Sequence, residues 1–147
     1  MQHAEWDDEP TTRFEKLAMA RVLVAEDDDS LREMMASRLR HDGCEVVEAR
    51  TGDEALDLIS QIRGGRGPID GLDLLIMDIR MPGLSGLEVG YLVRSWSVSA
   101  PLLFVTAYPE PELLDEMRQL RARVIAKPFG LSRLSTAANE ALRTRVS

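Results

Sequence analysis

The sequence predicts an α/β fold, a doubly wound parallel sheet of five strands in the order 2-1-3-4-5 with helices on both faces. Two observations predict it. Short apolar segments of strand length recur along the 147 residues, and stretches with helical spacing lie between them. Strands that alternate with helices form βαβ crossovers, which place neighbouring strands parallel to one another.

The expected strands are rich in Val, Ile and Leu. They are RVLVA (21–25), CEVVEA (44–49), LDLLIM (72–77), PLLFV (101–105) and RVIA (123–126). The third and fourth are nearly continuous apolar runs, which is typical of strands covered on both faces. The second carries more charge, which favours a place at the edge of the sheet.

The first expected helix follows strand one and shows an amphipathic pattern. Its apolar stripe consists of Leu31, Met34, Met35 and Leu39. The pattern places Arg32, Glu33, Arg38 and Arg40 on the outward face. We therefore expect the methionines of this helix to belong to the core.

Three helix starts fit the S/T-x-x-E capping box, in which two side chains satisfy unpaired backbone N–H groups. The pairs are Ser30 with Glu33, Thr51 with Glu54, and Ser85 with Glu88. Two later helices are expected over about 110–121 and 131–145. The segment RGGRGPIDG (63–71) reads as a flexible connection and lacks the phosphate-binding-loop pattern.

Composition limits the classes of function. A net charge of −7 argues against binding to nucleic acid or to an anionic membrane, and no apolar run is long enough to span a bilayer. Residues 1–18 read as a flexible acidic arm without a secretory signal, and 19–147 as one domain. The single cysteine, Cys44, lies in an apolar setting typical of core packing, so a cytoplasmic location is expected.

Polar residues follow four of the five expected strands. Strand one is followed by Glu26 and Asp27, strand three by Asp78, strand four by Thr106 and strand five by Lys127. Because ligands of open parallel sheets bind beyond the carboxyl ends of the strands, we expect these side chains to converge there. The second strand ends without such a group, as suits an edge strand.

The converging residue types suit phosphoryl transfer. Glu26, Asp27 and Asp78 offer hard oxygen ligands for Mg²⁺, and without a metal their crowding should raise at least one carboxyl pKa. Lys127 and the hydroxyl of Thr106 can bind phosphoryl oxygens. Asp78 is then placed to act as a nucleophile toward phosphorus and to become an aspartyl phosphate.

From about Arg21 to Arg145 the chain resembles the response-regulator receiver domain of two-component signalling, a flavodoxin-like (βα)5 sandwich. The resemblance rests on VLVAEDDDSLR, LLIMDIRMPGLSGLE, FVTAY and AKPF, in that order. It implies that Asp78 is the phosphoacceptor and that Thr106 and Lys127 bind the phosphoryl group. It also implies a Mg²⁺ site, for which Mn²⁺ could substitute, made by Asp27, Asp78, the Arg80 carbonyl and, through a bound water, Glu26.

The resemblance carries further expectations and one departure. The Lys127–Pro128 bond is usually cis in the family. Receivers typically carry an aromatic residue three positions before the lysine, where this chain has Val124, which puts the usual aromatic switch in doubt. The side chains two positions beyond the phosphoacceptor and the threonine are Arg80 and Tyr108, and we expect these bulky groups to tune the phosphoryl lifetime.

The implied partners are a sensor histidine kinase or phosphotransfer protein and an unidentified downstream protein, with homodimer formation left open. No output domain follows the fifth helix, so the sequence reads as a stand-alone receiver or an excised domain. A degenerate receiver that only binds proteins is the alternative. An aspartyl-nucleophile phosphohydrolase or phosphotransferase is disfavoured, because it typically needs a second aspartate where Arg80 stands.

Overall fold

The computed structural model describes residues 19–144, so the expected arm over 1–18 lies outside the described residues. Its centre is a single parallel sheet in the order β2-β1-β3-β4-β5, which confirms the predicted order. The strands are β1 (Arg21–Ala25), β2 (Glu45–Ala49), β3 (Leu74–Asp78), β4 (Leu102–Thr106) and β5 (Ala122–Ala126).

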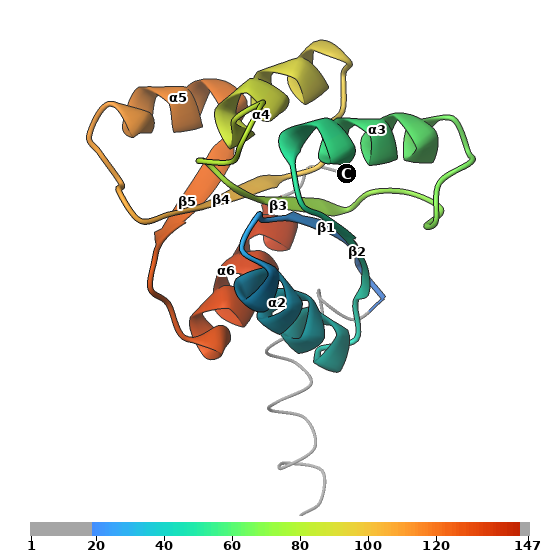
Figure 1. Ribbon diagram of the computed structural model, residues 1–147, viewed down its shortest axis with the longest axis horizontal. Coiled ribbons are helices and arrows are strands. Elements are labelled where there is room, and N and C mark those ends of the chain that lie inside the picture. The colour runs from blue at the N-terminus through green and yellow to red at the C-terminus, as the bar shows by residue number, and fades with distance from the viewer. Residues whose placement is uncertain (1–18, 145–147) are drawn as a thin grey trace, which may run out of the picture.

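Helices cover both faces of this sheet (Figure 1). On one face lie α3 (Gly52–Arg63), α4 (Gly86–Ser95) and α5 (Leu113–Leu120). On the other face lie α2 (Asp29–His41) and α6 (Leu131–Arg143). No helix in the described part of the chain is long and apolar enough to cross a membrane.

The strand bounds differ from the sequence prediction by one or two residues for local reasons. Asp73 binds the backbone N–H and the Nε of Arg21 with one carboxylate oxygen, at 2.8 and 2.9 Å, so β3 begins only after it. Pro101 has no N–H to donate to the ladder, and β4 begins at the next residue. At their carboxyl ends both strands run one residue further than predicted and include Asp78 and Thr106, the residues expected to follow them.

Two apolar layers hold the sheet between its helices. One contains Met35 and Leu39 of α2 and Leu134 of α6, and it also takes in Cys44, as predicted. The other lies under α3, α4 and α5. Every residue of β3 and β4 is buried, whereas β2 and β5 are only partly buried, as expected for edge strands.

Helix capping follows the sequence prediction at α4, in part at α3, and not at α2. At α4 the Ser85–Glu88 capping box is complete. Thr51 caps α3 by accepting from the N–H of Glu54, whose carboxylate accepts from Arg50 instead. The capping box predicted at Ser30 is wrong, because helix α2 starts two residues earlier, within the acidic run.

The N-cap of α2 is Asp28, whose side chain accepts from the N–H of Leu31 at 3.0 Å. An Asp is as good a cap as a Ser, so residue type alone could not decide between them. Two positions of α2 also lie on another face than the sequence predicted. Arg32 is buried, although it was expected to face outward, and Met34 is 51% exposed, although it was expected in the core.

Candidate functional site

Four polar side chains lie at the carboxyl edge of the sheet, each from a different strand end. They are Glu26 after β1, Asp78 in β3, Thr106 in β4 and Lys127 after β5. The strand order reverses between β1 and β3, so this edge is the switch point at which open α/β sheets bind ligands. The structure thus brings together residues separated by up to about a hundred positions in the sequence.

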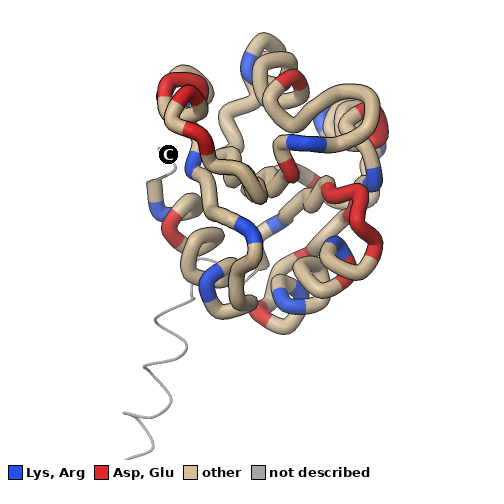
Figure 2. Tube along the Cα trace, turned by 60° about the vertical axis from the view of Figure 1, so that its left-hand side comes forward, with Lys and Arg blue, Asp and Glu red and all other residues tan. Residues whose placement is uncertain are grey.

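Three carboxylates form the acidic part of the site. Glu26, Asp27 and Asp78 each offer one oxygen, and these oxygens lie within 4.8 Å of one another. Glu26 and Asp78 are buried, whereas Asp27 is exposed. The acidic run that contains the first two forms a long continuous red stretch in Figure 2. Placing Asp27 at the surface leaves this cluster open to solvent cations.

Lys127 joins the two buried carboxylates. Its Nζ donates a hydrogen bond to Asp78 Oδ2 at 2.8 Å and lies 2.9 Å from Glu26 Oε1. Burial lowers the pKa of Lys127, but these carboxylates more than offset it, and the net shift is upward. The lysine therefore stays charged in the site. The Lys127–Pro128 bond is cis, in agreement with the resemblance.

Glu26 is the carboxyl group whose pKa the site disturbs most. Its pKa is raised to about 7, first by burial and then by the charge of Asp78. The N–H of Asp28, which donates to Glu26 Oε2 at 3.0 Å, and the charge of Lys127 oppose the rise. A raised carboxyl pKa was predicted from crowding, but burial is the larger cause.

The acidic cluster fits a hard divalent cation. Glu26 Oε1 is buried, and Lys127 Nζ lies 2.9 Å from it. This one lysine faces three carboxylates, so the cluster keeps an excess of negative charge that a further cation would offset. The donors are all oxygen, which is the ligand set of Mg²⁺ rather than of Zn²⁺ or Cu²⁺. The share of the Arg80 carbonyl in such a site stays a prediction.

Asp78 is held in place at both of its oxygens. Oδ1 accepts from the N–H of Arg80 at 3.0 Å, and Oδ2 accepts from Lys127. In the sheet Asp78 is paired with Val105, so Thr106 lies one residue beyond it on the neighbouring strand. Thr106 Oγ1 accepts from the N–H of Tyr108 at 3.1 Å, which leaves the hydroxyl proton available to donate.

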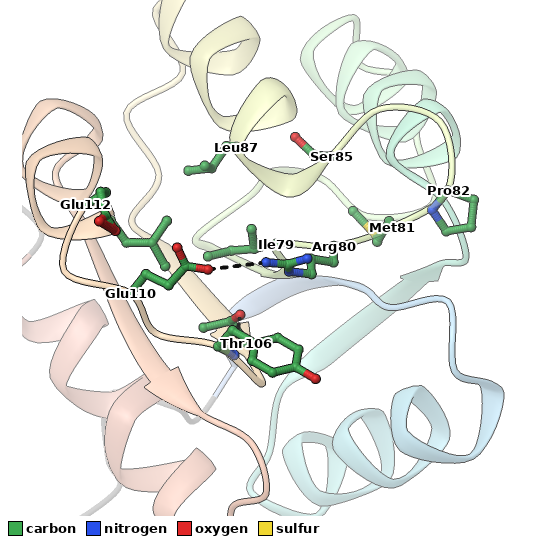
Figure 3. Close-up of a pocket in the computed structure, with 11 residues that line it drawn as sticks. Ile79, Arg80, Met81, Pro82, Ser85, Leu87, Thr106, Glu110 and Glu112 are labelled. Carbon is green, nitrogen blue, oxygen red and sulfur yellow. Dashed lines mark hydrogen bonds and ion pairs between the residues drawn. The ribbon is translucent and has the colours of Figure 1, made fainter.

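A pocket of about 600 Å³ lies beside these residues, between the loops that follow β3 and β4 (Figure 3). The guanidinium of Arg80 crosses it and lies 3.5 Å from the carboxylate of Glu110. The same guanidinium lies 5.1 Å from the ring centre of Tyr108. Sequence reasoning singled out Arg80 and Tyr108 separately. It missed their contact, and nothing in the spacing of the two residues indicated it.

Val124 lies on β5, partly buried against the apolar layer under α3, α4 and α5. The structure therefore has an aliphatic side chain at the position where the resembling family usually has an aromatic one. The effect of this departure on any switch stays a prediction.

Comparison with known proteins identifies related chains. The family described as response regulator receiver domain matches residues 22–139. Transcriptional regulatory protein PdtaR of Mycobacterium tuberculosis is 34% identical over 130 residues, which are 87% of this chain and 59% of PdtaR. A cyclic di-GMP phosphodiesterase of Thermotoga maritima is 33% identical over 126 residues, 85% of this chain but 32% of that protein. The chain thus spans less than two thirds of these relatives.

Solved structures show the same architecture over their whole length. Chemotaxis protein CheY4 of Vibrio cholerae is 31% identical and superimposes with a TM-score of 0.72, covering 84% of this chain and 99% of that one. The non-phosphorylated HemR receiver domain of Leptospira biflexa is 26% identical with a TM-score of 0.75, covering 87% and 98%.

Proposed function

The chain belongs to the response regulator receiver domain family, and from this premise we propose that Asp78 accepts a phosphoryl group in a Mg²⁺-dependent reaction. The donor is a phosphohistidine of a sensor histidine kinase or of a phosphotransfer protein. The resulting aspartyl phosphate changes how the domain binds a downstream protein. The chain in this proposal is a signalling phosphoacceptor of a two-component system.

One observation carries the proposal: a buried Asp78 whose two oxygens are oriented by the N–H of Arg80 and by Lys127, beside two further carboxylates. The Asp78 side chain is only 8% exposed. It lies beside Asp27, which is exposed, so solvent reaches this side of the acidic cluster. Orientation and charge neutralisation dominate phosphoryl transfer, so a fixed carboxylate beside a lysine is the arrangement such a reaction requires.

In the transfer step an Asp78 carboxylate oxygen forms a bond to phosphorus while the phosphorus–nitrogen bond of the phosphohistidine breaks. The imidazole nitrogen keeps the electron pair of that bond and takes up a proton. In this proposal Lys127, which now donates to Asp78, would follow the negative charge to the new phosphoryl oxygens, and the Thr106 hydroxyl would donate to one of them.

Glu26, Asp27, Asp78 and the Arg80 carbonyl would hold the Mg²⁺ ion. When bound, the ion supplies positive charge that offsets the crowded carboxylates and the incoming phosphoryl oxygens. Glu26 fits this role because its buried carboxylate lies within 4.8 Å of the other two, and the single charge of Lys127 does not balance all three. Asp27 fits because it is exposed and within reach of the other two.

The same residues limit the chemistry to self-modification. Arg80 stands where an aspartyl phosphotransferase would need its general acid/base, and its side chain is bound to Glu110 and stacked on Tyr108. We therefore propose that the domain catalyses only its own phosphorylation and dephosphorylation. The activity in the name of the Thermotoga maritima relative is not carried over, because the chain covers 32% of that protein.

Intact mass measurement tests the proposal. After incubation with acetyl phosphate and Mg²⁺, we expect the protein to gain the mass of one phosphoryl group, and to gain none when EDTA replaces Mg²⁺. Asp78→Asn should gain none, because it lacks the nucleophile. Asp57→Asn, at an exposed position of α3, is the matched control and should behave as wild type.

Two results would overturn the assignment. One is the absence of a mass gain in the wild-type protein with Mg²⁺ present. The other is an equal gain in Asp78→Asn, which would place the acceptor elsewhere. A gain that is unaffected by EDTA would contradict the Mg²⁺ requirement alone.

A further inference from the structure

Arg32 is a charged side chain buried beneath the acidic loop. It lies in the first turns of α2 and only 3% of it is exposed. Burying a guanidinium costs free energy unless its donors are satisfied by acceptors and its charge by carboxylates. The contacts that Arg32 makes therefore indicate what holds it there.

All three nitrogens of Arg32 have acceptors in different directions. Nη1 donates to the backbone carbonyl of Glu26 at 2.9 Å. Nη2 forms an ion pair with Asp29 Oδ1 at 2.7 Å, and Nε donates to Glu48 Oε1 at 3.2 Å. The planar fork of an arginine can reach three acceptors at once, whereas a lysine presents a single point charge.

The contact with Glu26 is the one that concerns the cation site. The carbonyl of Glu26 belongs to the peptide plane that joins it to Asp27, so fixing this oxygen fixes how the Asp27 backbone leaves the strand. Asp27 is exposed, and its side chain depends on that backbone for its direction. Arg32 thus orients the pair of carboxylates without touching either of them.

Through Glu48 the contact extends to the edge of the sheet. Glu48 lies in β2, the one strand of the described sheet that ends without a polar residue in the site. Its other oxygen, Oε2, lies 3.3 Å from Arg40 Nη2. The network therefore runs from the surface of α2, through β2, to the loop that carries Glu26 and Asp27.

We propose that Arg32 is a positioning residue for the divalent-cation site, holding the Glu26–Asp27 loop through the Glu26 carbonyl while Glu48 of β2 holds Arg32. This inference rests on one part of the proposed function, the divalent-cation site, and not on the phosphorylation of Asp78. In this proposal the edge strand β2 affects cation binding only indirectly, through the contact of Glu48 with Arg32. Side chains that orient metal ligands typically change metal affinity by about tenfold or more when replaced.

A Mg²⁺ titration followed by backbone amide chemical shifts tests the proposal and monitors folding in the same spectra. Arg32→Lys keeps the charge and loses the fork, and Arg32→Met loses both. We expect both to weaken Mg²⁺ binding by about tenfold or more. Arg40→Met is the matched control: it removes an arginine from the same helix and the same Glu48 without touching Glu26, and its affinity should stay close to wild type.

Simple charge effects predict the opposite pattern. Removing a positive charge near an acidic cluster should tighten cation binding, so Arg32→Met would bind Mg²⁺ as well as or better than wild type, and Arg32→Lys would be unchanged. Either result overturns the positioning role. Should Arg32→Met fail to give a folded spectrum, the result for Arg32→Lys decides.

Asp27→Ala separates this proposal from the cation site itself. A sharp loss of Mg²⁺ affinity in Asp27→Ala with no loss in Arg32→Lys refutes the positioning role and leaves the site intact. Unchanged affinity in Asp27→Ala removes Asp27 as a ligand, and the positioning role with it.

Discussion

Glu26 makes the stability of the folded protein depend on pH. Its carboxyl group is buried beside Asp78, and its pKa is raised to about 7 from the value of 4.5 expected for an exposed Glu. Between these two values the folded protein binds a proton that the unfolded chain does not. The free energy of unfolding therefore falls as pH rises through this window, because the carboxylate must ionise while buried.

Replacing Glu26 by Gln removes this pH-dependent cost. In EDTA we expect Glu26→Gln and wild type to differ little below pH 4.5, and the variant to become relatively more stable as the pH rises to about 7. The gain is at most about 3 kcal/mol. Thermal unfolding across this pH range measures it. A difference that is independent of pH, or that grows toward acid, would contradict the raised pKa.

Residue types could predict the members of the site but not all of their surroundings. Glu26, Asp27, Asp78, Thr106 and Lys127 stand directly after or at the end of apolar segments, and a parallel sheet gathers such positions at one edge. Their roles in phosphoryl transfer and cation binding remain proposals.

The burial of Arg32 could not be predicted, because it depends on Glu48, sixteen positions away on another element. Helical periodicity predicts which apolar residues face the core. An arginine next to that apolar face is then assigned to the surface, unless the acceptors that bind its guanidinium are known.

At the level of elements, the start of α4 packs closely against the end of β3, which carries Asp78. Gly86, the first residue of this helix, donates its N–H to the carbonyl of Ile79 at 2.8 Å. A Cβ at Gly86 would overlap the backbone carbonyl of Asp78 and lie 3.0 Å from Ile79 Cα. The helix therefore approaches the end of β3 at a distance that only glycine allows.

Gly86→Ala should destabilise the protein and disturb the site together. We expect a loss of about 2 kcal/mol in the free energy of unfolding, because backbone atoms must move to admit the methyl group. Urea unfolding followed by circular dichroism measures it. Gly64→Ala is the control, since its Cβ would have no neighbour closer than 3.5 Å at the exposed end of α3. Equal stability of the two variants would refute the close-packing argument.

The helix starts show what sequence can and cannot decide about an element. Ser85 and Thr51 cap their helices as predicted, whereas Ser30, with a glutamate at the same spacing, does not. In α2 the run Asp28, Asp29, Ser30 offers three capping residues in succession. Asp28 is the residue that caps α2, and its own N–H donates to the carboxylate of Glu26.

For the molecule as a whole, the topology was the most predictable feature. Five apolar segments with helices between them leave few arrangements of a parallel sheet, and the quoted motifs indicated one family among these. The loops beyond the strands were less predictable. The contact between Arg80, Tyr108 and Glu110 joins two loops that are thirty residues apart in sequence, and no local rule brings such side chains together.

The central claim is that the folded domain carries a phosphoryl group on Asp78. Borohydride reduction converts an aspartyl phosphate to homoserine, and peptide mapping then locates it. After treatment with acetyl phosphate and Mg²⁺, we expect homoserine at position 78 of the wild-type chain and at no other aspartate. Homoserine at another aspartate, or at none while the protein carries a phosphoryl group, would contradict it.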